Sequence, residues 1–550
     1  MEIKRDAYLN QLVTRMHNGF VKVITGLRRS GKSYLLNKIF YSYLVSRGIP
    51  EDHIIRFAFD SADDLSMIGE DFIELENRNQ KVDPKKFMSF LGSKIKDDEM
   101  YYLLLDEVQN LGSFESVLNA YLRKDNLDIY VTGSNSKFLS SDVLTEFEGR
   151  GDEIHLFPLS FKEFYSVFQG TKDEAYEQYS IHGGLPFVVS MVTNSQKENH
   201  LKSLLSKVYL NDIIKHNNLK RDSNIAELLD LVASGIASFT NTSKLEARFR
   251  SIKKVAISRT TIDHYVDYFI DSFLISKAIK YDIKGKMYID TPYKLYFEDV
   301  GLRNAAIGFR QYEETHLMEN IIYNELRHRG FNVDVGVVET RTMDDGKQAR
   351  KQFEIDFVAT SGSNRYYIQS AYAIPDEAKW IQETNSFNRL DDSFKKIIVV
   401  KNPVVPRRNE KGYLIIGLYD FLLNENSLEQ YLPIGNRTKK DPVPRVLTVD
   451  TSPLFNMEDG FPFRLKLLFR DHLFVKELLP FFQQFHVVIQ LLRRSGFLLN
   501  FQGLFENEVS HVQEESEDHD DASHHGDDVA NGSIVGTGFG GFPQRNDSQS

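Results

Sequence analysis

The stretch VITGLRRSGKSYLL, residues 23–36, decides the fold of this chain. It fits the pattern G-x-x-x-x-G-K-[ST] at Gly26, Gly31, Lys32 and Ser33. The glycines of this pattern let backbone N–H groups turn inward around phosphate oxygens. An apolar run precedes the pattern and a helical run follows it, so the helix would direct the positive end of its dipole at an anion. The stretch therefore predicts a phosphate-binding loop and not a chance glycine-rich turn.

Two acidic residues complete the predicted site. The segment YYLLLDE ends an apolar strand with Asp106 and Glu107, at the edge where parallel α/β sheets bind ligands. Ser33 and Asp106 are expected to hold Mg²⁺, and Glu107 to polarise the attacking water as general base. An isolated acidic pair would be better explained as a solvated strand end, but this pair follows a well-placed phosphate loop.

The loop supplies the remaining contacts with the nucleotide. Lys32 is expected to reach the outer phosphates and to act in catalysis. The residues expected to contact ATP are Gly26, Arg29, Ser30, Gly31, Lys32, Ser33 and Tyr34.

Two further catalytic candidates rest on weaker patterns. The segment VTGSNS ends another strand with small polar residues, so Asn135 or Ser134 could sense the γ-phosphate; an ordinary strand-end turn is the alternative. Arg150 precedes the last strand of this region and could act as an arginine finger that neutralises charge in phosphoryl transfer. A surface arginine is the alternative, and action within the chain or on a neighbouring copy is left open.

The alternation of strands and helices over the first part of the chain predicts an α/β fold with a parallel sheet. The predicted strands are Phe20–Thr25, His53–Phe59, Tyr101–Leu105, Asp128–Thr132 and Glu153–Phe157. From about Ser160 the pattern becomes helical. A hairpin turned at Asp282–Met287 follows these helices, and helix then hairpin is the order of a winged helix.

Charge and composition exclude several classes of protein. Of the net charge of −11, −10 arises in the tail from Glu506 onward, which carries eleven acidic residues and one basic residue, so the rest of the chain is close to neutral. The absence of cysteine excludes a disulfide scaffold and a cysteine-ligated metal site. No apolar run approaches the ~18 residues needed to span a bilayer. The N-terminus also lacks the apolar core of a signal peptide, so we expect a cytoplasmic protein without membrane contact.

Six segments, taken in order, resemble one family: TGLRRSGKS, LLLDEVQN, VTGSNS, GRGDEIHLFPLSFKEF, IHGGLPFVV and YLNDIIKH. They are similar to prokaryotic AAA-type P-loop ATPases that are related to the archaeal ATPases. In this family the ATPase is fused to a C-terminal domain of unknown function. The resemblance spans residues 1–428 and includes the linking segment KLYFEDVGLRNA. It implies a P-loop NTPase sheet with an additional strand, in which the strand before Asn135 lies between the loop strand and the Asp-Glu strand. It also implies a winged helix near residues 225–290.

The last domain of that family resembles a restriction-endonuclease-like α/β fold. Its pattern requires a glutamate, an aspartate and a Glu-x-Lys strand. Glu319 and Asp356 fit this pattern, but Gln369 and Ala371 stand where Glu and Lys are required. Gln369 supplies no carboxylate charge to Mg²⁺, so we expect a degenerate site without nuclease activity, whose fold serves binding or regulation.

We therefore expect five parts in the chain. They are a P-loop AAA-type ATPase domain (1–165), a helical lid and winged-helix region (166–305), a degenerate restriction-endonuclease-like domain (306–428), an extension of unknown fold (429–505) and an acidic, Gly-rich tail (506–550).

The predicted function is Mg²⁺-dependent hydrolysis of ATP to ADP and phosphate, used as a conformational switch. The alternative is a nucleotide-regulated DNA-binding or protein-interaction module with little turnover; Glu107 favours hydrolysis, because a binding module needs no general base. DNA is a candidate partner because basic residues cluster beside the predicted winged helix, although a solvated helix face would look the same. They are Lys244, Arg248, Arg250, Lys253, Lys254 and Arg259. A homo-oligomer is a further candidate.

Overall fold

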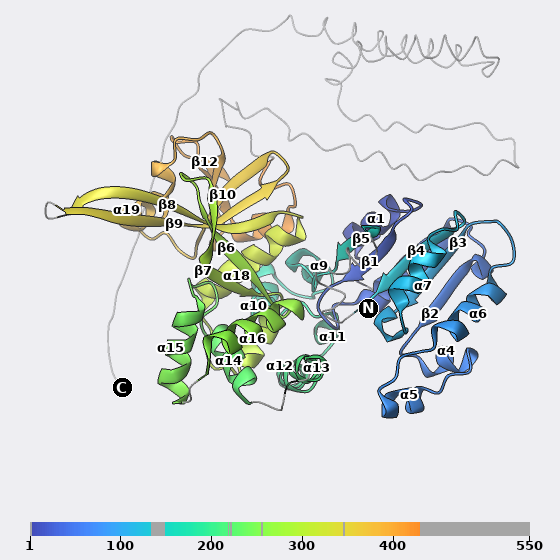
Figure 1. Ribbon diagram of the computed structural model, residues 1–550. Coiled ribbons are helices and arrows are strands. Elements are labelled where there is room, and N and C mark those ends of the chain that lie inside the picture. The colour runs from blue at the N-terminus through green and yellow to red at the C-terminus, as the bar shows by residue number, and fades with distance from the viewer. Residues whose placement is uncertain are drawn as a thin grey trace, which may run out of the picture. The chain divides into compact units, whose positions relative to one another are not determined.

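The computed structural model describes residues 3–133, 149–217, 219, 223–254, 257–344 and 347–429 (Figure 1). Ser134 and Asn135, the extension expected at 429–505 beyond its first residue, and the tail lie outside these ranges. Within them, no helix combines the length and apolar character that crossing a membrane requires.

The first part of the chain forms a parallel five-stranded sheet with the order β2-β3-β4-β1-β5. Its strands are β1 (Val21–Thr25), β2 (Ile54–Ala58), β3 (Tyr101–Asp106), β4 (Leu127–Thr132) and β5 (Gly151–His155). All five coincide with predicted strands to within a few residues. Strand β4 lies between β1 and β3, so the α/β fold class and the predicted placement of this strand are confirmed.

Strand β3 is buried on both faces, which explains its continuous apolar run. Leu103 and Leu105 belong to one hydrophobic cluster, and Tyr102 and Leu104 belong to another on the opposite face, because successive side chains alternate along a strand. Helices with residues in the first cluster are α4 (Ala62–Met67), α6 (Pro84–Lys94) and α7 (Phe114–Tyr121), with the short α5 (Phe72–Arg78) beside them. The helices with residues in the second hydrophobic cluster are α1 (Asp6–Thr14) and a continuous helical run. This run consists of α2 (Lys32–Tyr34), η1 (Leu35–Phe40) and α3 (Tyr41–Ser46).

A helical region follows the sheet. Its elements are α9 (Phe161–Tyr165), α10 (Lys172–His182), α11 (Pro186–Val189), α12 (Asn194–Leu204), η5 (Leu205–Tyr209), α13 (Leu210–His216), α14 (Ser223–Ala233), α15 (Thr242–Lys253), α16 (Arg259–Asp271) and α17 (Val300–Ala306). Capping boxes start α9, α10 and α12, where the cap hydroxyl and a Glu or Gln three residues later satisfy backbone N–H groups reciprocally. Ser258 caps α16, as its serine and threonine cluster predicts.

The second sheet has eight strands in the order β12-β13-β11-β10-β9-β8-β6-β7. They are β6 (Ile275–Asp282), β7 (Met287–Phe297), β8 (Asn332–Asp344), β9 (Lys347–Ser361), β10 (Asn364–Ala371), β11 (Lys395–Val400), β12 (Arg407–Arg408) and β13 (Leu414–Gly417). It is accompanied by α18 (Glu314–His328), α19 (Glu377–Thr384) and α20 (Leu418–Leu423). The β6–β7 hairpin turns where predicted, but β6 also pairs in parallel with β8. The expected wing is therefore part of a larger sheet.

Strands β8 and β9 form a long antiparallel hairpin, which extends as a two-stranded ribbon from the rest of the sheet (Figure 1). The segment FEIDFVAT, residues 353–360, has the pattern of a strand, and it forms only the second half of β9. The segment HLMENIIYNELRHRGF, residues 316–331, has the pattern of an amphipathic helix, but the residues of α18 from Leu317 to Leu326 are buried on all sides. The difference arises because this helix packs among both the sheet and the helical region.

Candidate nucleotide-binding site

The phosphate loop follows β1, and its backbone adopts conformations that its glycines permit. Gly26 has φ 130° and Gly31 has φ 102°, and Arg29 also lies in the left-handed region at φ 68°. A Cβ atom on Gly26 would approach the Leu156 carbonyl oxygen to 2.2 Å, because the chain after β5 passes directly over this position. Only glycine therefore fits at Gly26. When left-handed and right-handed backbone conformations alternate, successive N–H groups point toward one concavity. Anion binding requires this arrangement.

Lys32 lies within this concavity. Its side chain is 5% exposed, and its ammonium donates hydrogen bonds to the carbonyl oxygens of Gly26 (2.8 Å) and Leu27 (3.1 Å). Burial lowers the pKa of Lys32 to about 8, although the nearby carboxylates of Glu107 and Asp106 oppose the shift. The buried ammonium is thus bound by two neutral backbone carbonyl oxygens. An anionic group would bind it more strongly, because charge–charge interactions are stronger away from water.

Ser33 and Asp106 meet at the carboxyl edge of the sheet. The Ser33 hydroxyl donates to Asp106 Oδ1 at 3.1 Å, and the Asn37 amide donates to Oδ2 at 3.2 Å. Thr132, at the end of β4, also donates to Asp106. Burial raises the pKa of Asp106, while the hydrogen bonds from Thr132 and Ser33 oppose this rise. The predicted metal pair is therefore assembled, with Thr132 and Asn37 orienting the carboxylate.

Glu107 follows Asp106 in a left-handed conformation, with φ 50° and ψ 47°. Its backbone N–H donates to the Thr132 hydroxyl at 3.1 Å, and its carboxylate accepts a hydrogen bond from the Gln109 amide. A left-handed non-glycine residue is uncommon, and such strain persists where the surroundings hold it in place. The carboxylate is thus directed by the backbone and by Gln109, beside the Ser33–Asp106 pair.

Sequence reasoning missed three residues of this edge. Thr132 ends a predicted strand, and Asn37 lies four residues after Ser33, one helical turn away, so both carried a usable signal. Asp60 follows β2, and burial together with the charges of Glu107 and Asp106 raises its pKa. Acidic residues after two neighbouring parallel strands would have indicated this proximity.

These side chains fit a nucleotide with Mg²⁺. Hydroxyl and carboxylate oxygens are the hard ligands that Mg²⁺ takes, and it commonly keeps several waters and uses only one or two protein carboxylates with substrate phosphates. Within the described ranges, no group of three or more His, Cys, Asp or Glu side chains is arranged to hold a metal.

The other predicted site residues lie as follows. Ser30 is buried, and its hydroxyl has no hydrogen-bond partner among the described residues. Arg29 and Tyr34 are exposed beside the loop. Arg150 is exposed at the amino end of β5, where its carbonyl accepts a hydrogen bond from the Val21 N–H (2.9 Å).

The position of Arg150 corrects one form of its predicted role. Strand β5 is parallel to β1, so Arg150 lies at the edge opposite the phosphate loop. Five residues of strand span about 16 Å, which is beyond the reach of an arginine side chain. Arg150 cannot act as a finger on the loop of its own chain.

The acidic residues expected from the nuclease-like pattern do come together. Glu319 of α18 accepts hydrogen bonds from Lys294 Nζ (2.7 Å) and from the Tyr296 hydroxyl (2.7 Å). Lys294 also pairs with Glu354 at 2.5 Å. Asp356 is buried, and it accepts a hydrogen bond from the Ser370 N–H at 2.7 Å. The ammonium of Lys294, which sequence reasoning missed, thus neutralises this acidic group.

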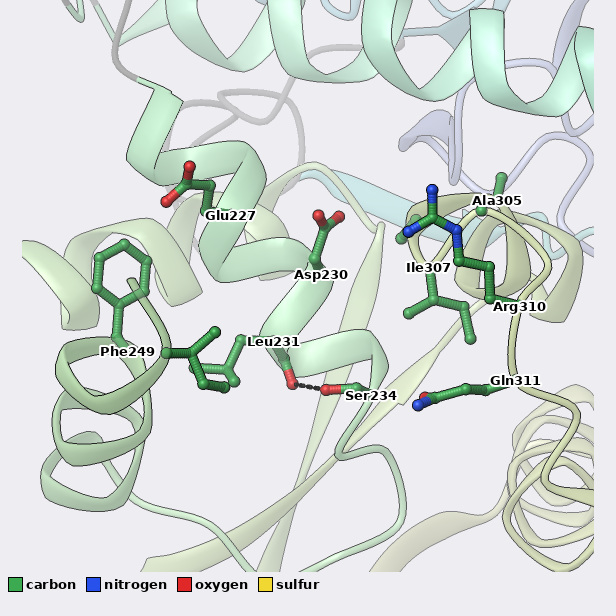
Figure 2. A pocket seen from close by; sticks show the side chains of 12 residues that line it. Glu227, Asp230, Leu231, Ser234, Phe249, Ala305, Ile307, Arg310 and Gln311 are labelled. Carbon is green, nitrogen blue, oxygen red and sulfur yellow. Dashed lines mark hydrogen bonds between the residues drawn. The ribbon is translucent and has the colours of Figure 1, made fainter. Parts of the chain in front are cut away.

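A hollow of about 530 Å³ lies on the helical region, and no residue of the phosphate loop lines it (Figure 2). Glu227 and Asp230 of α14 line it together with Arg310 and Gln311, which follow α17. Ser234 donates to the carbonyl of Leu231 in its own helix (2.9 Å). None of the predicted site residues lines this hollow.

Comparison with known proteins places two domains in the chain. A profile of the AAA domain matches residues 18–165, and a profile of a domain of unknown function, DUF8612, matches residues 173–313. Among solved structures, the chain is similar to Aeropyrum pernix ORC1 in complex with DNA (11% identity, TM-score 0.27, 56% of this chain and 92% of that one). It is also similar to Cdc6p from Pyrobaculum aerophilum (13% identity, TM-score 0.24, 58% and 94%). Such low scores carry no conclusion about function.

Two relatives align over most of the chain. The uncharacterized protein MJ1544 of Methanocaldococcus jannaschii is 26% identical over 399 residues, which cover 69% of this chain and 81% of the relative. An uncharacterized protein of Haemophilus influenzae is 33% identical over 427 residues, which cover 76% of this chain and 98% of the relative. The chain therefore belongs to the same family as the Haemophilus influenzae protein, and it carries an AAA domain that is followed by DUF8612.

Proposed function

We propose that this protein hydrolyses ATP to ADP and phosphate with Mg²⁺ as cofactor. The observation that carries the proposal is the contact between Ser33 and Asp106, with Glu107 next to it on the same strand end. A module that only binds nucleotide needs the loop, but it has no need of a directed carboxylate beside the metal pair.

Each residue has one role in this proposal. Lys32 holds the outer phosphates, and Ser33 and Asp106 hold Mg²⁺, which supplies charge neutralisation in phosphoryl transfer. Glu107 accepts the proton of the attacking water or orients it. Asn135 remains the candidate for sensing the γ-phosphate.

Steady-state hydrolysis by the wild type, Lys32→Ala and Glu107→Gln tests the proposal. A nucleotide-dependent conformational switch is the use we propose for this turnover. Its structural support is the contact between the phosphate loop and the helical region, in which Tyr209 and Asp212 hold Arg28.

Arg150 fits a role between copies of the chain. Because it is exposed and lies opposite the loop of its own chain, only a second copy could present it to a nucleotide. Hydrolysis whose specific rate rises with protein concentration in the wild type, but not in Arg150→Ala, would support a homo-oligomer. Equal rates for both proteins at every concentration would remove Arg150 from the catalytic group.

DNA binding is the second candidate function, and the basic residues of α15 favour it. Glu246 pairs with Arg250 (2.6 Å) and with Arg259 (2.6 Å), so these two cations are partly neutralised. Arg248 is exposed on the same helix. The measurement is the salt dependence of binding to duplex DNA, since the slope falls by about one for each phosphate that a variant no longer neutralises. Binding that survives Arg248→Ala with Lys254→Ala would exclude this patch.

The remaining domain assignments are part of the proposal. The AAA profile ends at residue 165, the limit proposed for the ATPase domain. We retain 166–305 as the lid and winged-helix region and 306–428 as a degenerate nuclease-like domain, although strands on both sides of residue 305 share one sheet. The ion pairs of Lys294 support the expected lack of nuclease activity. Cleavage of plasmid DNA with Mg²⁺ that is lost in Asp356→Ala would contradict it.

A further inference from the structure

The phosphate loop has a second side, which packs on the helical region. Leu27 is completely buried, and it shares a hydrophobic core with Tyr209, Leu210 and Ile213. Among the described residues, the two clusters that cover the parallel sheet do not include Leu27. The loop is therefore anchored in the core of DUF8612 as well as in its own sheet.

Arg28 is held at two points by α12–η5–α13, a continuous helical run. The Tyr209 hydroxyl donates a hydrogen bond to the Arg28 carbonyl oxygen, and the Arg28 guanidinium pairs with Asp212. Tyr209 is 3% exposed, and burial raises the pKa of its phenol, so the hydroxyl stays protonated and donates. The Arg28–Asp212 pair is half-exposed, with side chains 40% and 47% accessible.

The run carries a π-helical segment directly before α13. This segment, Leu205–Tyr209, ends on the tyrosine that contacts the loop. A π-helical turn inserts a residue into the α-helical register, and such insertions occur frequently at functional sites. Tyr209 and Asp212 are three positions apart, so they share one face of the helix beyond the insertion.

Two further contacts surround the same loop. The Cγ atom of Pro186, at the start of α11, lies 3.8 Å from where a Cβ on Gly31 would stand. Burial, and then the charge of Arg29, lower the pKa of His200 on α12, which places the guanidinium near that helix. Arg28 of the loop thus contacts the η5–α13 run, Gly31 lies beside α11, and the charge of Arg29 acts on α12.

We propose that the η5–α13 run positions the phosphate loop: Tyr209 of η5 and Asp212 of α13 hold Arg28 so that the N–H groups from Arg29 to Lys32 keep the arrangement that binds phosphate. The inference rests on the proposed nucleotide site and adds its regulation. A rearrangement of DUF8612 that withdraws α13 weakens nucleotide binding, and nucleotide binding stabilises α13 to the same extent, because such coupling is reciprocal.

The experiment measures binding of a fluorescent ADP analogue with Mg²⁺ to the full chain. Asp212→Asn removes a half-exposed ion pair and is expected to weaken binding about two- to fivefold. Tyr209→Phe leaves the Arg28 carbonyl without its donor and is expected to weaken binding about tenfold. In an Arg28→Ala background the effect of Asp212→Asn disappears, because the two residues act as one unit.

Two matched variants control for general effects. Glu198→Gln removes a carboxylate from α12 whose ion pair among the described residues is with Lys202 (3.7 Å) in the same helix. Tyr121→Phe removes a hydroxyl that donates to the Met88 carbonyl (3.3 Å), far from the loop along the chain. Both are expected to bind the analogue as the wild type does. Hydrogen exchange of residues 205–216 supplies the reciprocal readout, which slows with nucleotide in the wild type and not in Tyr209→Phe.

The outcomes separate the two proposals. Wild-type protein that binds no nucleotide contradicts the proposed function and this inference with it. Nucleotide binding by the wild type, with Tyr209→Phe and Asp212→Asn both within twofold of it, contradicts the inference alone. Lower thermal stability of Tyr209→Phe with unchanged nucleotide affinity also contradicts the inference alone, because Tyr209 would then only support the fold.

Discussion

The Ser33 hydroxyl lies 3.1 Å from Asp106 Oδ1, although 73 positions separate the two residues in the chain. Ser33 lies in α2, after the loop that follows β1, and Asp106 ends β3. Strand β4 lies between β1 and β3, and its last residue, Thr132, donates to the same carboxylate oxygen. Two hydroxyls from separate elements thus converge on one oxygen. This convergence joins the phosphate loop and the acidic strand into a single site.

Asp106→Asn is expected to remove the gain in ATP affinity that Mg²⁺ provides. The amide keeps the size of the carboxylate but carries no negative charge for the cation, so Mg²⁺-dependent affinity should fall about 10- to 100-fold. Affinity measured with EDTA should stay unchanged. Calorimetric titration with ATP, with and without Mg²⁺, provides the measurement.

Asp64→Asn is the matched control for this change. Its carboxylate also lies near a strand end, but it accepts a hydrogen bond from the Ala58 N–H at 2.8 Å. An equal loss of the Mg²⁺ effect in both variants would show that Asp106 is not the ligand.

Nucleotide affinity is expected to decrease as pH rises above about 8. The pKa of Lys32 is lowered to about 8 by burial, and the phosphates must be met by its protonated form. Below that pH the ammonium is already present, so affinity should be constant. Above it, binding requires proton uptake, and affinity should fall about tenfold per pH unit until the ordinary range of lysine is reached.

The profile is obtained from dissociation constants between about pH 7 and pH 9.5. Lys32→Ala should bind weakly but with a flat profile over the same range, since the titrating group is gone. A flat profile for the wild type would mean that Lys32 does not pair with phosphate.

Gly26→Ala is expected to abolish nucleotide binding and to destabilise the fold by about 1–3 kcal/mol. The new methyl group would meet the Leu156 carbonyl oxygen at 2.2 Å, in a backbone conformation with φ 130°. Gly92→Ala is the control, and it is expected to change the free energy of unfolding in the opposite direction. Gly92 lies in α6 with open space around it, so alanine there should stabilise the protein by about 0.5–1 kcal/mol. Thermal unfolding of both variants distinguishes these signs.

Lys294→Met is expected to destabilise the second sheet by about 3–5 kcal/mol, because it leaves buried carboxylates unpaired. Burial alone lowers the pKa of Lys294, but Glu319, Glu354 and Asp356 raise it above its ordinary value. Trp380, the single tryptophan, lies in α19 and reports unfolding of this part by fluorescence.

The cost of Lys294→Met should shrink as the pH falls. Burial, and then Glu319, raise the pKa of Asp356, so this carboxyl takes up a proton and loses its charge before an ordinary aspartate does. Lys162→Met serves as control, because Lys162 and Glu425 form an exposed pair worth less than about 0.5 kcal/mol. Equal and small effects of both variants would show that Lys294 does not stabilise the sheet.

The sequence predicted the parts of the site that local patterns encode. Gly26 and Lys32 belong to a spaced motif, and the run before Asp106 is apolar at every position because both faces of β3 are covered. Those patterns identify the loop, the strand and the edge at which they meet. The place of β4 between β1 and β3 followed from the family resemblance.

Long-range pairing could not be predicted in the same way. Lys294 looks like any strand lysine until α18 and β9 bring three carboxylates to it. The segment YLNDIIKH indicates the family, but nothing in its sequence shows that Tyr209 and Asp212 contact Arg28. The sequence position of Arg150 fits an arginine finger, but sequence position does not show at which edge of the sheet a residue lies. In the fold, Arg150 lies at the edge opposite the phosphate loop.

Steady-state ATP hydrolysis by the wild type, Lys32→Ala and Glu107→Gln tests the central claim most directly. We predict Mg²⁺-dependent turnover by the wild type that falls about 100-fold or more in both variants, with Glu107→Gln retaining ATP affinity because only the directed carboxylate is changed. Wild-type turnover no faster than that of the two variants would contradict the assignment as an ATP-hydrolysing enzyme.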